Sequence, residues 1–307
     1  MTQSIVFAGT PANAAKTLRD LIAAGIEVAL VITRPDAPTG RKAVLTASPV
    51  ADTAMELGIA VHKSLSIDAE TISAIRATSA EVGVIVAFGS ILKPEALEAL
   101  PLGWFNLHYS LLPQLRGAAP VQHAIIRGLP ETGVTLFRLD QGVDTGEFVS
   151  QVQTKIEPGE TAARLLDRLT SLGTSLLIQD LPAIFAGTSA SRPQAGQPSS
   201  APKIDRAMAR IDFSRTAREL EGLVLGCNPE PGAWAVDGAN PIKIHDAFAF
   251  EVKQDLVPGT VFMHGNHVAV ACAGNTALAL REVQPAGKQR MSASDWFRGK
   301  SNEVRLS

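Results

Sequence analysis

Short apolar runs alternate with helix-like segments over the first half of the chain, and this alternation limits the possible folds more than any other feature. The runs are typical of buried strands, and the segments between them have the spacing of amphipathic helices. Such alternation predicts a Rossmann-like α/β fold, a mostly parallel sheet with helices on both faces. We expect strands at 4–8, 28–33, 82–87 and 104–108, and helices at 13–24, 50–57, 70–78 and 94–100.

The composition changes near residue 187, and the change predicts a second domain. With 307 residues the chain is longer than one typical core requires. Residues 188–205 are rich in Ser, Pro and Gly, as linkers are. We therefore expect an α/β domain over 1–187 and a small β-barrel, with an oligonucleotide-binding (OB) fold as one candidate, over 206–307. Its expected strands are 233–236, 242–250, 260–263, 267–272 and 277–283.

Composition also excludes several classes of protein. Hydrophobic residues make up 46% of the chain and charged residues 19%, which is typical of a globular rather than a disordered protein. The net charge of −2 provides no overall field that would draw the chain onto nucleic acid. No stretch has the roughly 18 apolar residues of a membrane span, and no signal-peptide pattern is present. We expect a cytoplasmic monomer without membrane contact, in which Cys227 and Cys272 are reduced apolar residues.

Three polar residues stand at alternate positions around the end of the fourth expected strand: Asn106, His108 and Ser110. Alternate residues of a strand point to the same side, so these side chains should share a face. Burying polar side chains costs free energy unless they are hydrogen-bonded, so three of them at one strand end indicate a function. Asp144 follows in a glycine-rich loop. An amide that donates to an oxyanion, an imidazole that moves a proton and a carboxylate that orients the imidazole are sufficient for acyl transfer.

Each of these residues also has a plainer interpretation. His108 could be a satisfied core histidine, and both Asp144 and Asp140 could simply cap turns in their loop. A metal site assembled from the same residues and His123 would lack any recognised ligand spacing, so no metal is expected. Ser110 does not lie in a Gly-x-Ser-x-Gly context, which argues against a nucleophilic serine.

Two loops near the expected strand ends have ambiguous patterns. Gly9-Thr10-Pro11 lacks the three-glycine spacing of a dinucleotide-binding turn, so a tight turn or a close backbone approach to another ligand is the simpler interpretation. The segment 34–42 contains three cations, among them Arg41 and Lys42. A solvated loop and a contact to an anionic substrate explain this segment equally well.

Several longer motifs occur together along the chain. The first half contains Asn-Leu-His-Tyr-Ser-Leu-Leu-Pro at 106–113, Arg-Gly-Ala-Ala-Pro at 116–120 and Asp-Thr-Gly at 144–146, and further matches lie at 7–11, 35–41, 48–50, 209–213, 228–234 and 284–288. In combination these motifs resemble those of the formyltransferases that use 10-formyltetrahydrofolate. The matches beyond residue 200 are similar to those of the members that act on initiator tRNA.

The resemblance implies transfer of a formyl group from the co-substrate 10-formyltetrahydrofolate to the free amino group of methionyl-initiator tRNA, for translation initiation. Asn106, His108 and Asp144 would carry the chemistry. The folate would contact Ser110, Leu111, Leu112, Pro113, Phe88, Gly89, Leu92, Leu139 and Asp140. The tRNA would contact Gly9, Thr10, Pro11, Arg41 and Lys42, and the barrel would lie along its stem.

Three other functions are compatible with parts of the pattern. A formyltransferase acting on an amino-sugar nucleotide would share the first domain, but the motifs of the second half argue against it. A hydrolase of 10-formyltetrahydrofolate would use water in place of the amine. A nucleotide-binding protein without chemistry would not need the polar residues around 106–110.

Overall fold

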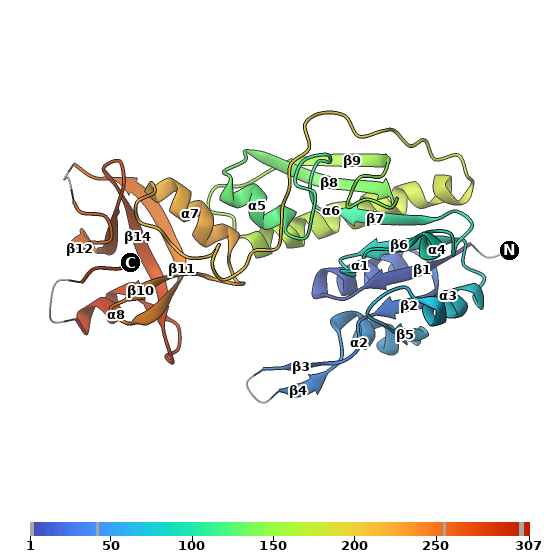
Figure 1. Cartoon of the computed structure of the whole chain (residues 1–307), viewed down its shortest axis with the longest axis horizontal. Coiled ribbons are helices and arrows are strands. Elements are labelled where there is room, and N and C mark those ends of the chain that lie inside the picture. The colour runs from blue at the N-terminus through green and yellow to red at the C-terminus, as the bar shows by residue number, and fades with distance from the viewer. Residues whose placement is uncertain (1–2, 41–42, 254–255, 301–303) are drawn as a thin grey trace. The chain divides into compact units, whose positions relative to one another are not determined.

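The computed structural model describes residues 3–40, 43–253, 256–300 and 304–307. The chain divides into two compact units (Figure 1). The first comprises Met1–Pro120, Thr132–Thr154 and Leu166–Pro202, and the second comprises Val121–Glu131, Lys155–Leu165 and Lys203–Ser307. The division after Pro202 falls within the segment 188–205, which the composition predicts as a linker. None of the described helices is both long enough and apolar enough to cross a membrane.

A seven-stranded sheet forms the centre of the first unit, in the order β5-β2-β1-β6-β7-β8-β9. The five strands from β5 to β7 are parallel to one another, and β8 pairs with β7 in the antiparallel sense. The predicted mostly parallel sheet is therefore confirmed, and the carboxyl ends of the parallel strands share one edge. The strands are β1 Ser4–Gly9, β2 Glu27–Thr33, β5 Val61–Lys63, β6 Val82–Val86, β7 Trp104–His108, β8 Glu131–Arg138 and β9 Phe148–Lys155.

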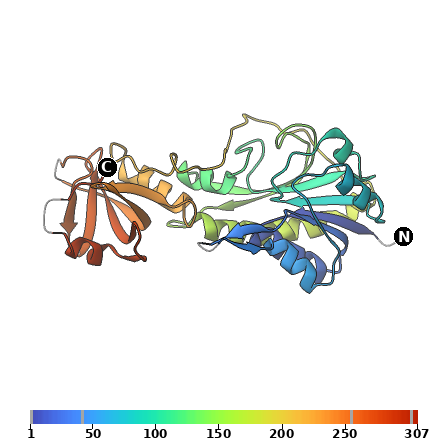
Figure 2. The ribbon, with the colours of Figure 1, turned by 60° about the horizontal axis from the view of Figure 1, so that its bottom comes forward.

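Helices cover both faces of this sheet (Figure 2). On one face, Trp104 belongs to the same buried cluster as Ile75 of α3 and Ala96 of α4. On the other face, the α6 backbone at Gly173 approaches Leu107 of β7. This alternation along β7 leaves Asn106 and His108 on the Trp104 side. The helices are α1 Ala12–Ala23, α2 Pro49–Glu56, α3 Ala69–Arg76, α4 Pro94–Leu97 and α6 Ala162–Phe185.

Part of the segment 34–42, predicted as a loop, is the first strand of a hairpin. The strand β3 (Ala37–Thr39) pairs in the antiparallel sense with β4 (Val44–Thr46), and both strands are exposed. Pro38 lies within β3, and proline normally argues against a strand, so the pattern gave no signal for this edge hairpin. Arg41 and Lys42 lie outside the described residues.

The second unit contains an antiparallel sheet in the order β10-β11-β14-β13-β12, and the C-terminus closes it. Residues 304–307 pair with both outer strands, because Ser307 exchanges backbone hydrogen bonds with Val236 of β10 and Val304 accepts one from Val261 of β12. An edge covered in this way cannot recruit another strand. The predicted C-terminal β domain is confirmed. Its elements are β10 Ala233–Asp237, β11 Asn240–Glu251, β12 Val261–His264, β13 His267–Cys272, β14 Thr276–Pro285, β15 Met291–Ser292, α7 Ala217–Gly226 and α8 Ala293–Arg298, and α5 spans Pro120–Ile126.

Close packing of Gly83 in β6 against Trp104 in β7 yields a stability prediction. A Cβ atom at position 83 would lie 2.1 Å from the indole ring. We expect Gly83→Ala to lower the free energy of unfolding by about 1–3 kcal/mol, since the ring or β7 must shift. Urea unfolding measures the change. Gly299→Ala is the matched control, because its nearest neighbour would be 3.6 Å away. Equal midpoints for the two variants would contradict this packing.

Candidate active site

A cavity of about 500 Å³ opens at the carboxyl ends of β6 and β7. Its volume is in the range of small-molecule sites, and ligands of open α/β sheets bind at this edge. Residues within 85–92, 106–109, 117–120 and 139–144 line the cavity. The first two segments begin in the last residues of the parallel strands β6 and β7, while the last segment follows the antiparallel strand β8.

The structure brings eight of the predicted site residues to this cavity. The three predicted catalytic residues, Asn106, His108 and Asp144, line it. Five of the nine predicted folate contacts line it as well, and these are Phe88, Gly89, Leu92, Leu139 and Asp140. Residues from three separate segments of the chain therefore share one space large enough for a ligand.

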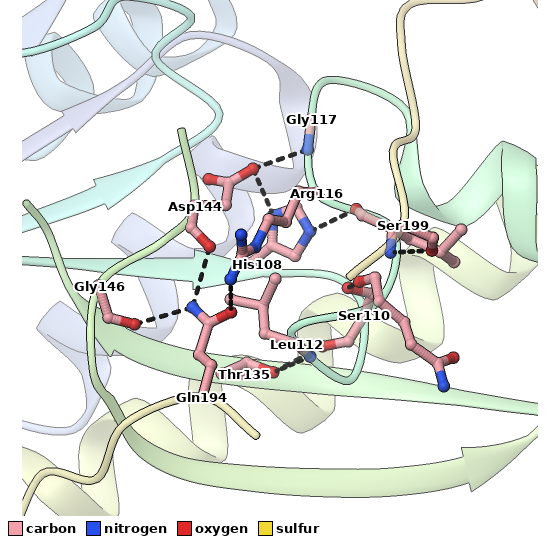
Figure 3. A network of polar contacts seen from close by, with 12 residues as sticks. His108, Ser110, Leu112, Arg116, Gly117, Thr135, Asp144, Gly146, Gln194 and Ser199 are labelled. Carbon is pink, nitrogen blue, oxygen red and sulfur yellow. Dashed lines mark hydrogen bonds and ion pairs between the residues drawn. The ribbon is translucent and has the colours of Figure 1, made fainter. Parts of the chain in front are cut away.

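His108 is 5% exposed and lies between two acceptors (Figure 3). Its Nε2 is 2.9 Å from the carbonyl oxygen of Leu115, which can only accept, so we assign the proton of the neutral ring to Nε2. Its Nδ1 is 3.6 Å from Oδ2 of Asp144. Burial lowers the pKa of His108, although the charge of Asp144 and the Leu115 bond raise it; the charge of Arg116 lowers it further. A neutral ring with a free Nδ1 is a proton acceptor.

Asp144 is held in a left-handed backbone conformation, with φ 52°. Its Oδ2 accepts a hydrogen bond of 2.7 Å from the backbone N–H of Gly117, and its carbonyl oxygen accepts one of 2.9 Å from Gln194. Two positions later, a Cβ at Gly146 would lie 1.8 Å from the Arg138 carbonyl oxygen, so this turn needs glycine. The left-handed conformation of Asp144 costs about 1–3 kcal/mol and persists only where its surroundings impose it.

Asp140, in contrast, serves the turn itself. Its Oδ1 accepts hydrogen bonds from the backbone N–H of Gly142 and from the hydroxyl of Thr145. The turn-capping interpretation is therefore correct for this carboxylate, which also lines the cavity. Among the described residues, no group of three or more His, Cys, Asp or Glu side chains is placed to hold a metal ion.

Asn106 has an unpaired amide oxygen. Its Oδ1 is buried and has no hydrogen-bond partner within the described part of the chain. Leaving a buried acceptor unpaired costs about 1–3 kcal/mol, so such groups are rare outside functional sites. Because Asn106 also lines the cavity, a bound ligand is the obvious partner for its amide.

The other four predicted folate contacts do not line the cavity, and these are Ser110, Leu111, Leu112 and Pro113. The shared face predicted for Ser110 is wrong, because β7 ends at His108. The Ser110 hydroxyl instead donates to the carbonyl oxygen of Gln114 at 2.6 Å. Thr135 of β8 donates to the Ser110 carbonyl oxygen and accepts from the Leu112 N–H, which fixes this turn to the sheet. Contact of this turn with a folate stays a prediction.

The turn Gly9-Thr10-Pro11 does not line the cavity either. A Cβ at Gly9 would lie 2.8 Å from both Ala14 Cβ and the Val86 carbonyl oxygen, so packing of β1 against α1 and β6 already requires glycine. The hydroxyl of Thr10 is buried and unpaired among the described residues. Its contact with a substrate remains a prediction.

Three residues that shape the cavity were not identified from the sequence as site residues. Arg34 donates to the carbonyl oxygens of Phe88 and Gly89 in the cavity wall. Arg116 donates to the side chain of Gln194 at 2.6 Å. The Arg-Gly-Ala-Ala-Pro motif could have indicated Arg116, whereas Gln194 lies in a polar stretch that has no pattern pointing to a site.

The environment of His108 gives a prediction that nuclear magnetic resonance can test. We expect His108 to titrate below about 6.5, the ordinary value. Asp144→Asn should move the midpoint to still lower pH, since it removes the charge that favours the imidazolium ion. In the control Asp140→Asn, which keeps an acceptor in the turn, the midpoint should stay as in the unsubstituted protein. A higher midpoint in Asp144→Asn would refute this electrostatic arrangement.

Comparison with known proteins identifies the family of this chain. The model of the formyl transferase family matches residues 2–181, and the model described as "Formyl transferase, C-terminal domain" matches residues 203–301. An N-formyltransferase from Helicobacter canadensis, solved with folinic acid and dTDP-3-aminofucose, superposes with a TM-score of 0.67 at 19% identity, covering 91% of this chain and 98% of that one. At this identity the likeness shows the fold alone.

Two relatives match over nearly their full length. A methionyl-tRNA formyltransferase from Paenarthrobacter aurescens (strain TC1) is 44% identical over 302 residues, covering 98% of both chains. A methionyl-tRNA formyltransferase from Leifsonia xyli subsp. xyli (strain CTCB07) is 45% identical over 303 residues, covering 99% of both. The chain therefore belongs to the formyl transferase family, together with these methionyl-tRNA formyltransferases.

Proposed function

We propose that this protein transfers a formyl group from 10-formyltetrahydrofolate to the amino group of methionine on initiator tRNA. The observation that carries the proposal is the meeting of Asn106, whose amide oxygen is unpaired, with the His108–Asp144 pair in one cavity. Relatives of the same name, 44–45% identical over almost the whole chain, support the choice of acceptor. We further propose that the protein acts in the cytoplasm as a monomer and without a metal.

The folate is proposed to occupy the cavity between the segment after β6 and the loop after β8. Phe88, Leu92 and Leu139 provide apolar walls for its ring system, and the backbone of that loop offers polar groups to the ring edge. Ile91 and Val143, which are largely exposed and also line the cavity, supply apolar surface for the rest of the molecule. The proposed contact with Ser110–Pro113 would require the folate to extend beyond the cavity.

The reaction needs one proton acceptor and one oxyanion donor. The amine nitrogen attacks the formyl carbon, so a carbon–nitrogen bond forms and a tetrahedral centre with a negative oxygen develops. Nδ1 of His108 takes the proton that the amine loses, and Asp144 stabilises the resulting imidazolium ion. The bond from the formyl carbon to N10 then breaks as the carbonyl re-forms, and the imidazolium ion of His108 gives its proton to N10.

Asn106 is suited to the oxyanion because its amide has both kinds of polar atom. The Nδ2 group can donate to the developing negative oxygen. The unpaired Oδ1 can accept from an N–H of the attacking amine, which would direct the amine lone pair towards the formyl carbon. The Oδ1 atom of Asn106 is buried, and an interaction in such surroundings is stronger than in water.

The tRNA is proposed to approach along the turn Gly9-Thr10-Pro11 and the segment that contains Arg41 and Lys42. Cations in such a segment would pair with phosphates, and the second unit is proposed to lie along the stem. Release of counterions makes this kind of binding sensitive to salt. These contacts rest on the resemblance to the family and on the charge of the segment.

Removal of the Asn106 amide tests the chemical part of the proposal. We expect Asn106→Ala to lower kcat by roughly 100- to 1000-fold while the protein stays folded, because one oxyanion donor is lost. The exposed Asn240, replaced by Ala, is the control. Steady-state kinetics with both substrates measures the change, and full turnover by Asn106→Ala would show that its role is misassigned.

An acceptor assay tests the proposed substrate. The protein is incubated with labelled 10-formyltetrahydrofolate and either methionyl-initiator tRNA or an amino-sugar nucleotide. We expect label on the methionine amine alone. Label on the sugar would replace the proposed acceptor, and release of free formate at the same rate without any acceptor would indicate a hydrolase.

A further inference from the structure

The stretch that the sequence predicts as a linker is bonded to the catalytic loops. Its residue Gln194 lies between the loop of Asp144 and the loop of Arg116 (Figure 3). Nearby, the Ser199 hydroxyl accepts from the N–H of Leu115, whose carbonyl oxygen in turn accepts from His108. Residues far apart in the sequence therefore set the surroundings of the catalytic histidine.

The side-chain amide of Gln194 forms three hydrogen bonds. Its Nε2 donates to the carbonyl oxygens of Asp144 at 2.9 Å and Gly146 at 2.8 Å. Its Oε1 accepts from Nη2 of Arg116 at 2.6 Å. Only this orientation of the amide fits, because the reverse would place an oxygen against two carbonyl oxygens and an NH₂ group against a guanidinium.

Gln194 bonds to the backbone of Asp144 and to the guanidinium of Arg116, and the charges of these two residues act on His108. The charge of Asp144 raises the pKa of His108, and the charge of Arg116 lowers it. The backbone of Asp144 is in the left-handed region, a conformation that persists only where surrounding contacts impose it. A single amide therefore bridges the loop of Asp144 and the side chain of Arg116.

We propose that Gln194 is a positioning residue for the reaction, which fixes Asp144 and Arg116 relative to His108. This inference rests on the proposed function, since it assigns Gln194 a role in that reaction. Gln194 is not among the residues that line the catalytic cavity. Its contribution should therefore affect the chemical step rather than the binding of either substrate.

Steady-state kinetics separates these two effects. We expect Gln194→Ala to lower kcat by about 10- to 100-fold, as misplacing a catalytic group by about 1 Å does. KM for methionyl-tRNA and for 10-formyltetrahydrofolate should stay close to that of the unsubstituted protein. The matched control is Gln197→Ala, because Gln197 is an exposed glutamine of the same stretch.

Gln194→Glu should change the pH dependence of the reaction, which a loss of folding would not do. The new carboxylate can still accept from Arg116, but it faces the two carbonyl oxygens without a donor. Its charge offsets that of Arg116, which raises the pKa of His108. Because His108 must be neutral to accept a proton, the acid limb of the kcat/KM profile should move to higher pH.

The same shift should occur when His108 is titrated by nuclear magnetic resonance without substrates. If the unsubstituted protein failed to formylate methionyl-tRNA, the proposed function would fail while this titration could still be measured. The positioning role is overturned if Gln194→Ala retains the kcat of Gln197→Ala, or if its activity falls only in proportion to the folded fraction. It is also overturned if His108 in Gln194→Glu titrates at the same pH as in the unsubstituted protein.

Discussion

The burial of His108 between the Leu115 carbonyl oxygen and the Asp144 carboxylate is the constraint on which the site depends. Removal from water favours the neutral ring. The Leu115 carbonyl oxygen can only accept a hydrogen bond, so the ring proton of His108 lies on Nε2. The free Nδ1 then faces the Asp144 carboxylate, which can stabilise a proton received there. A base that is neutral at rest and stabilised once charged suits removal of a proton from an amine.

The sheet explains how these groups meet. Parallel strands place the end of β7 and the segment after β6 at one edge, and the antiparallel strand β8 returns the chain to that edge before the loop of Asp144. The loop closes with a left-handed aspartate and a glycine that no other residue could replace. Gly117 and Gln194 then hold this loop from two sides.

Strong periodicity made much of the fold predictable. The expected strand 104–108 coincides with β7, and the expected helix 13–24 differs from α1 by one residue at each end. The β3–β4 hairpin was missed because its strands are three residues long and contain Pro38. The expected face of Ser110 was wrong for a related reason. Alternation applies only while the strand continues, and the pattern does not mark its last residue.

The sequence by itself determined the parallel α/β architecture and the C-terminal β domain, and it indicated Asn106, His108 and Asp144 as candidates for the site, because periodicity and residue chemistry are local properties. Only the tertiary structure decided which atoms meet. The proton position on His108 depends on a carbonyl seven residues away, and the hold on Asp144 depends on Gln194, 50 residues away. Such contacts follow from how distant segments pack, and a polar stretch such as 188–202 carries no local signal of the partners it will bind.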